Sequence, residues 1–432
     1  MSRINVRRDW FQLSERMGMA SKLLVDIHTH VYLPRYATLL RSRSSVPMIR
    51  PSSTPDGKLD ERLLILDHEP SGGRPVGPQY WDREEKLRFM DKHGIDVSVV
   101  RCPRLLYTFK PSTNFAPSTA NPWLDFLPPS QAQKFAENLN EDLEDYCSTS
   151  PVVPDLSIKR LYGFGLLPLV PDITTPALLD AVRQISELPH LRGLIMGTRG
   201  VGNGLDDEAL DPVWAAIEAA GLVVFLHPHY GVDSKAWGDK DNGHVLPLAL
   251  GFPFETTIVS RYNASRHELS AFFQAVTRLI LSGVLDRFPG LRLLLAHSGG
   301  ALPQLSSRLA SCIDHDPIVA SRLDHDARYY LGKLYLDAVA YGPEELGFVS
   351  DAIARSGRYR KGVSVSGPPQ RSLGSQRMLF GTDHPFFPPL SSTEKWRSVV
   401  ENLEAIEAVQ GWSQADRDGV RGGNAIALFD LN

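Results

Sequence analysis

Cysteine is scarce in this chain of 432 residues, and the few cysteines present are widely spaced. The three residues, Cys102, Cys147 and Cys312, are odd in number and form no metal-binding pair. This pattern excludes a small secreted domain held together by disulfides. We therefore expect reduced thiols and a cytoplasmic protein.

Long hydrophobic runs and a strong excess of either charge are also missing. No apolar run approaches the roughly 18 residues of a membrane-spanning helix. The first twenty residues are polar, carry four arginines and lack the apolar centre of a signal peptide. The formal net charge of −4 gives no reason to expect nucleic acid or an anionic membrane as a partner.

No Gly-x-Gly-x-x-Gly motif follows the first apolar run, which argues against a doubly wound dinucleotide-binding sheet. The chain instead contains eight short apolar runs with helical patterns between them. Runs that are apolar on both faces and separated by helices indicate parallel strands covered by helices. Eight such units predict an α/β protein with one (β/α)8 barrel of the TIM type. The predicted strands are 23–28, 95–100, 161–169, 191–197, 221–229, 291–300, 333–341 and 376–387.

Histidines stand at the carboxyl ends of several predicted strands, where barrels of this type carry their chemistry. His28 and His30 are two residues apart, so both side chains point to the same face of an extended strand. His227, His297 and Asp383 lie at the ends of three other predicted strands. Any one of them alone is typical of a structural side chain. Four histidines and one aspartate at one barrel mouth are better explained by a divalent metal, and three histidines with one aspartate suit zinc best.

A lysine is missing from the fourth predicted strand, which reads LRGLIMG over residues 191–197. Binuclear metallohydrolases of this general kind use a carboxylated lysine at that place to bridge two metal ions. The sequence therefore predicts one metal ion per chain.

Several motifs around these residues carry a family resemblance. DIHTH, FLHPHYG, LLLAHSGG and MLFGTDHPFF resemble the amidohydrolase-2 branch of the amidohydrolase superfamily, the branch of aminocarboxymuconate-semialdehyde and γ-resorcylate decarboxylases. NPWLDFL, GHVLPLALGFPFETT, SCIDHD and LYLDAVAY resemble more closely the fungal isoorotate (uracil-5-carboxylate) decarboxylases of thymine salvage. The resemblance extends from about Lys22 to the C-terminus. It implies a zinc-dependent, non-oxidative decarboxylase of pyrimidine metabolism, a small carboxylic acid as substrate, and a homodimer.

The resemblance also implies a role for each matching residue. The metal ligands would be His28, His30, His227 and Asp383, binding zinc, with manganese as the open alternative. The catalytic residues would be Asp383 and His297, because loss of CO2 from a ring carbon requires a nearby proton donor. The substrate contacts would be Arg74, Asn121, Phe252 and Phe386.

Two other enzyme functions stay open at this point. Related decarboxylases act on phenolic or muconate-type acids with the same metal set. A single zinc ion can also activate water, as in a mononuclear hydrolase. The missing lysine and the pair of phenylalanines favour decarboxylation.

Three stretches depart from the family pattern, near residues 101–119, 259–274 and 357–375. Each is polar or basic and lacks the periodicity of its surroundings. Our hypothesis is that they are translated introns, and the non-enzyme alternative is then an inactive product. Genuine surface loops are the other interpretation. Residues 1–21 are expected to be a disordered extension, which leaves 22–432 as one barrel domain.

Overall fold

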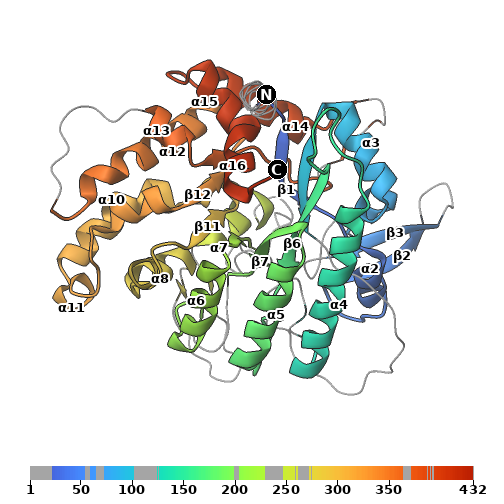
Figure 1. Cartoon of the computed structure of the whole chain (residues 1–432), viewed down its shortest axis with the longest axis horizontal. Helices are drawn as coiled ribbons and strands as arrows, with labels where there is room; N and C mark the ends of the chain where they lie inside the picture. The colour runs from blue at the N-terminus through green and yellow to red at the C-terminus, as the bar shows by residue number, and fades with distance from the viewer. Residues whose placement is uncertain are drawn as a thin grey trace, which may run out of the picture.

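The central feature of the computed structural model is a parallel sheet that curls into a nearly closed barrel (Figure 1). Its eight strands follow the order β1-β5-β6-β7-β8-β11-β12-β13, so each strand pairs with the next strand of this sheet along the chain. The predicted (β/α)8 barrel is confirmed. The strands are β1 (Val25–His30), β5 (Val97–Arg101), β6 (Leu161–Leu166), β7 (Leu191–Met196), β8 (Val223–Leu226), β11 (Arg292–Leu295), β12 (Tyr335–Asp337) and β13 (Met378–Leu379).

The seam between the first and last strands is joined by backbone hydrogen bonds. Ile27 N–H donates to the carbonyl of Phe380, and Thr382 N–H donates to the carbonyl of His28. A parallel bridge between Thr29 and His384 extends the pairing past the end of β13. The residues that follow β13 therefore lie beside the end of β1.

The structure describes residues 22–53, 59–64, 73–101, 124, 126–198, 204–228, 247–257, 259–260, 272–273, 275–362, 371–386, 388–389, 391 and 394–431. The expected extension 1–21, Asn121 and nearly all of the stretch 101–119 lie outside these residues. Only the ends of the stretches 259–274 and 357–375 are described, so the three insertions stay predictions.

Helices alternate with the strands and cover the outside of the barrel (Figure 1). The α-helices are α2 (Pro34–Arg41), α3 (Arg83–His93), α4 (Pro129–Ser148), α5 (Thr175–Glu187), α6 (Asp211–Ala219), α7 (Phe252–Thr257), α8 (Ala275–Leu281), α9 (Val284–Arg287), α10 (Leu302–Asp314), α11 (Pro317–Ala320), α12 (Pro343–Arg355), α13 (Arg371–Ser375), α14 (Arg397–Ala408), α15 (Gln414–Asp418) and α16 (Asn424–Phe429). Shorter helical turns are η1 (Pro78–Tyr80), η2 (Glu208–Leu210), η4 (Pro247–Gly251), η5 (His297–Gly299), η6 (Ala327–Lys333), η7 (Ser356–Tyr359) and η8 (Gly419–Gly423).

Helix α5 shows how the sequence builds one of these units. The Thr174 hydroxyl accepts a hydrogen bond from Ala177 N–H, which caps the amino end of the helix. Buried apolar residues at helical spacing then face the sheet, as far as Ile185. A Cβ on Gly165 of β6 would lie only 2.5 Å from Ile185, so glycine allows the helix to pack closely on its strand.

Apolar side chains fill the barrel interior and the layer between barrel and helices. Ile27, Phe164, Phe225 and Leu294 are fully buried in the interior cluster. All six residues of β1 are buried, although two of them are histidines. Burying polar histidines at a strand end is costly unless they have partners. The partners lie in the site described below.

A second, smaller sheet is antiparallel and was not predicted. Its strands are β2 (Met48–Ser53), β3 (Leu59–Leu64) and β4 (Arg74–Val76), and Leu63 pairs with Arg74. Its apolar side packs on α2 in a cluster that includes Tyr36, Tyr80 and Val76. A two-residue ribbon, β9 (Val259–Ser260) with β10 (Phe272–Phe273), follows α7. The small sheet carries Arg74, one of the predicted substrate contacts.

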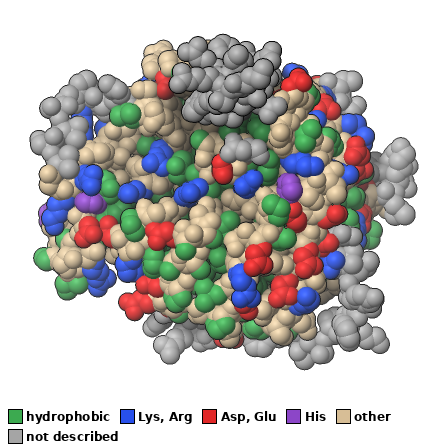
Figure 2. Space-filling view, viewed as in Figure 1, with side chains coloured by type: hydrophobic (Ala, Val, Ile, Leu, Met, Phe, Trp, Pro, Cys, Tyr) green, Lys and Arg blue, Asp and Glu red, His purple; other side chains and the backbone are tan. Residues whose placement is uncertain are grey.

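The outer surface offers few further clues. On the face shown in Figure 2, positive and negative side chains are interspersed. Within the described part of the chain, no helix is both long and apolar enough to cross a membrane.

Candidate metal centre and active site

Four predicted metal ligands converge at the carboxyl ends of the strands. His28 and His30 lie on β1, His227 follows β8, and Asp383 follows β13. His28 Nε2 lies 3.1 Å from His227 Nε2 and 3.3 Å from Asp383 Oδ1. His30 Nε2 lies 2.9 Å from the same carboxylate oxygen. All four residues are buried, so the fold itself assembles the cluster.

These spacings fit a bound metal ion. A tetrahedral zinc ion with ligand bonds of about 2.0–2.1 Å separates neighbouring ligand atoms by about 3.3 Å. The closest pairs in this cluster are 2.9, 3.1 and 3.3 Å apart. Ring nitrogens of the three histidines also lie within 4.8 Å of one another. The structure therefore contains a metal-binding site built from histidine and aspartate.

The charges in this cluster are strongly coupled. Burial lowers the pKa of His28, but the facing carboxylates of Asp383 and Asp337 outweigh it and raise this pKa to about 9. Burial raises the pKa of Asp383, yet His28 and His30 bring it well below its usual value. Without metal the cluster therefore retains a proton, which an incoming metal ion has to displace.

His297 lies beside the cluster, at the start of η5. Its ring centroid is 5.4 Å from those of both His28 and His227. One of its ring nitrogens lies within 4.8 Å of ligand atoms of His28 and Asp383. This position suits the predicted catalytic role, because His297 is close enough to exchange a proton with a group bound at the metal.

Asp337 also lies at this site, although the sequence reasoning did not single it out. It ends β12, is fully buried, and accepts a hydrogen bond of 2.6 Å from His28 Nδ1. Burial raises the pKa of Asp337, but the bond from His28 and neighbouring groups lower it below the usual value. An aspartate inside the apolar run predicted as strand 333–341 was the available signal.

Arg74 and Phe386 meet next to the metal ligands. The Phe386 ring lies edge-on to the His30 ring, with centroids 4.5 Å apart. The Arg74 guanidinium carbon lies 5.2 Å from the centre of the Phe386 ring. Arg74 is only 9% exposed, so it is no solvated surface arginine. The small sheet thus brings a cation to the cluster of predicted metal ligands, and the segment after β13 brings an aromatic wall.

The other two predicted substrate contacts are not placed in the same way. Phe252 begins α7 and is half-buried. α7 is linked to the η5 turn, because the Thr257 hydroxyl donates to the carbonyl of Gly299 at 3.5 Å. Within the described residues no ring contact joins Phe252 to Phe386, so the expected aromatic sandwich stays a prediction. Asn121 lies outside the described residues.

A second polar network lies behind β1 and was also missed. Lys86 of α3 is fully buried and donates to the Thr29 hydroxyl at 2.6 Å. Its Nζ lies 3.7 Å from Asp26, which in turn accepts hydrogen bonds from Thr382. His384 is stacked on the Phe89 ring, with centroids 3.7 Å apart. This network fastens β1 to the segment that carries Asp383.

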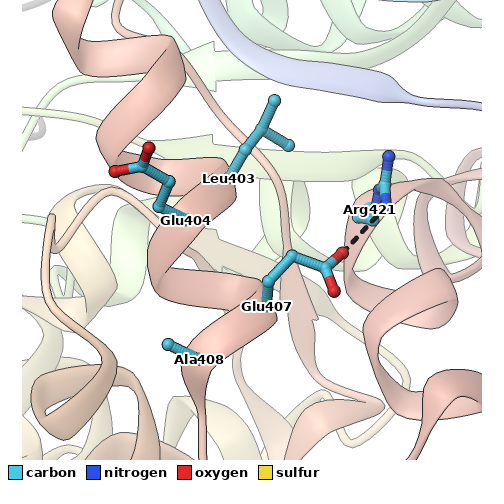
Figure 3. Close-up of a pocket in the computed structure, with 5 residues that line it drawn as sticks. All are labelled: Leu403, Glu404, Glu407, Ala408 and Arg421. Carbon is cyan, nitrogen blue, oxygen red and sulfur yellow. Dashed lines mark hydrogen bonds and ion pairs between the residues drawn. The ribbon is translucent and has the colours of Figure 1, made fainter.

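A surface pocket lies elsewhere, between α14 and η8 (Figure 3). Glu407 and Arg421 form an ion pair of 2.9 Å across it. The remaining lining residues are Leu403, Glu404 and Ala408. Among the described residues, none of the predicted catalytic, metal-binding or substrate-binding side chains lines this pocket, so it is separate from the candidate active site.

Comparisons with known proteins point to one family. Residues 126–345 match the amidohydrolase family. The chain is 24% identical to 2-amino-3-carboxymuconate-6-semialdehyde decarboxylase of Dictyostelium discoideum over 83% of this chain and 79% of that protein. The apo crystal structure of Metarhizium anisopliae isoorotate decarboxylase (IDCase) is 36% identical, with a TM-score of 0.74, covering 95% of this chain and 97% of that one. A manganese-bound dihydroxybenzoic acid decarboxylase from Polaromonas shares the fold, with 18% identity, a TM-score of 0.62, and coverage of 95% and 98%.

The chain belongs to the amidohydrolase family. Within that family it is a carboxy-lyase of the decarboxylase type, as its relatives are. The family resemblance and the enzyme class expected from the sequence are thereby confirmed.

Proposed function

We propose that the protein converts uracil-5-carboxylate (isoorotate) to uracil and CO2, with one zinc ion per chain. The observation that carries the proposal is the position of Arg74. A buried guanidinium beside an aromatic ring and a group of metal ligands is suited to binding a planar, anionic, carbonyl-bearing ring. The similarity to the Metarhizium isoorotate decarboxylase supports the same substrate.

The proposed metal ligands are His28, His30, His227 and Asp383. Three imidazole nitrogens and one carboxylate favour zinc, and manganese is the alternative to be tested. When bound, the metal ion supplies a Lewis acid that orients the substrate carboxylate and the neighbouring ring carbonyl.

Arg74 and Phe386 position the ring in this proposal. The guanidinium donates hydrogen bonds to the substrate carboxylate or to a ring oxygen. The Phe386 ring packs against the pyrimidine and keeps water away from the reacting carbon. Phe252 and Asn121 are proposed to complete this pocket from α7 and from the segment before α4.

The chemical step needs one proton at ring carbon 5. Protonation of that carbon gives an intermediate whose bond to the carboxylate then breaks, releasing CO2 and returning the electron pair to the ring. We assign the proton transfer to Asp383 together with His297. Because a carboxylate that binds a metal ion is deprotonated, Asp383 must first receive the proton that it delivers. His297 lies within 4.8 Å and is the group placed to provide it.

The test is uracil formation from uracil-5-carboxylate, followed by chromatography and by CO2 release. Chelator treatment is expected to abolish turnover, and zinc is expected to restore it better than manganese. His227→Ala serves as the metal-site control and is expected to be inactive. Turnover of 2,6-dihydroxybenzoate but not of uracil-5-carboxylate by the metal-loaded protein would contradict the substrate assignment.

The same assay tests the three proposed insertions. The 432-residue chain is compared with a version that lacks residues 101–119, 259–274 and 357–375. Turnover by the shortened version alone supports translated introns and an inactive full-length product. Turnover by both identifies the segments as tolerated loops. Light scattering on the same samples tests the proposed homodimer.

A further inference from the structure

Asp337 is anchored to both sides of the active site. Its Oδ2 accepts hydrogen bonds from His28 Nδ1 at 2.6 Å and from the backbone N–H of His297 at 2.9 Å. Its Oδ1 accepts from the N–H groups of Ser298 at 2.8 Å and Val339 at 3.1 Å. One fully buried carboxylate therefore receives four donors, two on each oxygen.

The bond to His28 determines which ring nitrogen faces the metal cluster. An imidazole that donates its Nδ1–H to a carboxylate can leave only Nε2 unprotonated for a metal ion. Nε2 is the atom that faces His227 and Asp383. The Phe225 ring packs edge-on against His28, with centroids 5.2 Å apart, which limits rotation of the imidazole.

The bonds to η5 stabilise an unusual turn. His297 and Ser298 have left-handed φ angles of 54° and 52°, which are unfavourable for residues other than glycine. Asp337 receives the N–H groups of both residues, and its own carbonyl accepts a hydrogen bond of 2.9 Å from the Ser298 hydroxyl. The same aspartate thus fixes the backbone position from which the His297 side chain extends.

We propose that Asp337 is a positioning residue that holds the metal ligand His28 and the proton-transferring His297 in a fixed arrangement relative to each other. The inference rests on the metal site and on the role of His297 in the proposed function. Its consequence is that one substitution disturbs metal binding and proton transfer together, although Asp337 contacts neither metal nor substrate.

Asp337→Asn is the informative substitution because it keeps the shape and removes one acceptor. Each carboxylate oxygen of Asp337 accepts two N–H donors. The asparagine NH2 group would face two donors in either orientation, so one pair of hydrogen bonds must break. The hydrogen bonds that are lost are either those from His28 and His297 or those from Ser298 and Val339.

The first readout is metal affinity of the full chain, measured for zinc by competition with a chromophoric chelator. Asp337→Asn is expected to weaken binding about 10- to 100-fold, the usual effect of losing a carboxylate behind a histidine ligand. The visible spectrum of the cobalt-substituted protein is expected to change as well. Affinity and cobalt spectrum equal to those of the unmodified protein would overturn the inference.

The second readout separates positioning from general stability. At saturating zinc, Asp337→Asn is expected to lower kcat at least about tenfold in the native background. In a His297→Gln background the same change should lower kcat by less than about twofold, because the group it positions is already gone. Equal losses in both backgrounds would show that Asp337 does not act through His297.

Two further variants keep the test decisive if Asp337→Asn folds poorly. Ser298→Ala removes only the hydroxyl bond to Asp337 and should lower kcat about fivefold while zinc affinity stays unchanged. No effect on kcat would refute the part that concerns the η5 turn. Asp286→Asn is the matched control, since Asp286 bonds Tyr330 at the other end of the barrel, before β11. It should change neither readout.

The outcomes distinguish this inference from the proposed function. If the unmodified protein binds no metal, both fail together. If it binds zinc but does not release CO2 from uracil-5-carboxylate, the substrate proposal fails. The affinity and cobalt measurements on Asp337→Asn then still decide the role of Asp337.

Discussion

Replacing Lys86 by methionine tests how the barrel is held together behind the metal site. Lys86 is fully buried on α3, 2.6 Å from the Thr29 hydroxyl and 3.7 Å from the Asp26 carboxylate. Burial lowers its pKa to about 8 even though Asp26 opposes the shift. Methionine fills a similar volume and removes the charge, so the main effect is an unpaired carboxylate in the interior.

The expected loss follows from that carboxylate. Removing one partner of a buried ion pair typically costs about 3–5 kcal/mol of unfolding free energy. Asp26 keeps hydrogen bonds of 3.1 and 2.9 Å from Thr382 and one of 3.3 Å from His28 N–H. We therefore expect the lower end, about 3 kcal/mol at pH 7.5. Lys86→Met combined with Asp26→Asn should regain about 1–2 kcal/mol, because no charge is then left unpaired.

The pH dependence provides a second check on the same variant. Burial raises the pKa of Asp26 even with Lys86 present, and losing Lys86 raises it further. The folded variant then binds more protons than the unfolded chain between the two pKa values of Asp26. Its stability must therefore fall as the pH rises through that window, and the defect should be smaller at pH 5 than at pH 7.5.

The assay is urea unfolding followed by tryptophan fluorescence and far-ultraviolet circular dichroism, which must agree for a two-state analysis. Lys134→Met is the control, since Lys134 pairs with Glu137 on the exposed face of α4 and should leave the midpoint unchanged. A loss below about 1 kcal/mol for Lys86→Met would refute the reasoning. So would an additive effect of the two substitutions.

Three further predictions concern the active site. Arg74→Lys should lower kcat/KM for uracil-5-carboxylate about 10- to 100-fold, mainly through KM, because it removes charged hydrogen bonds of about 1.5–3 kcal/mol. Gly300→Ala should raise KM and lower the melting temperature, since Gly300 has a φ of 59° and a Cβ there would overlap the carbonyl of Pro253 in α7. Zinc affinity should fall about tenfold for each unit of pH from 8 to 6, because metal must displace a proton from His28, whose pKa is raised to about 9.

Two of these predictions have a control variant, and two have a result that would contradict them. Arg41→Lys, in an exposed pair with Glu61 of the small sheet, should leave steady-state kinetics unchanged. Equal KM for the Arg74 variant and the native protein would remove Arg74 from the substrate site. Gly357→Ala, with no atom near the new Cβ, should behave like the native protein. Zinc affinity that is flat from pH 6 to 8 would show that no proton is displaced.

The barrel and the meeting of His28 with His30 could be predicted from the sequence because both depend on local patterns. Apolar runs on both faces of a strand are characteristic of a covered parallel sheet, and alternation places His28 and His30 on one face. The predicted strand 376–387 was too long, however. Pairing in β13 covers only Met378–Leu379, and Asp383 follows in a left-handed conformation with φ of 53°. The sequence pattern therefore placed Asp383, a predicted metal ligand, in a strand, whereas it lies in the loop that follows.

The positions of Arg74, Asp337 and Lys86 could not be predicted in the same way. Arg74 stands in a short Gly- and Pro-rich segment that gave no sign of a separate sheet. Its burial depends on antiparallel pairing between β3 and β4. No sequence pattern marks Lys86 as buried, and only its place beside Asp26 makes burial of its charge tolerable.

The amino-acid sequence alone thus determined the barrel, the ends of strands that carry chemistry, and the type of metal donor. Tertiary structure decided which of those donors meet, and which other charges support them. The bond between His28 and Asp337 joins residues 309 positions apart, and no local sequence pattern predicts a contact over such a separation. Such contacts form only when the eighth strand closes on the first, because closure alone brings the strand ends within hydrogen-bonding reach.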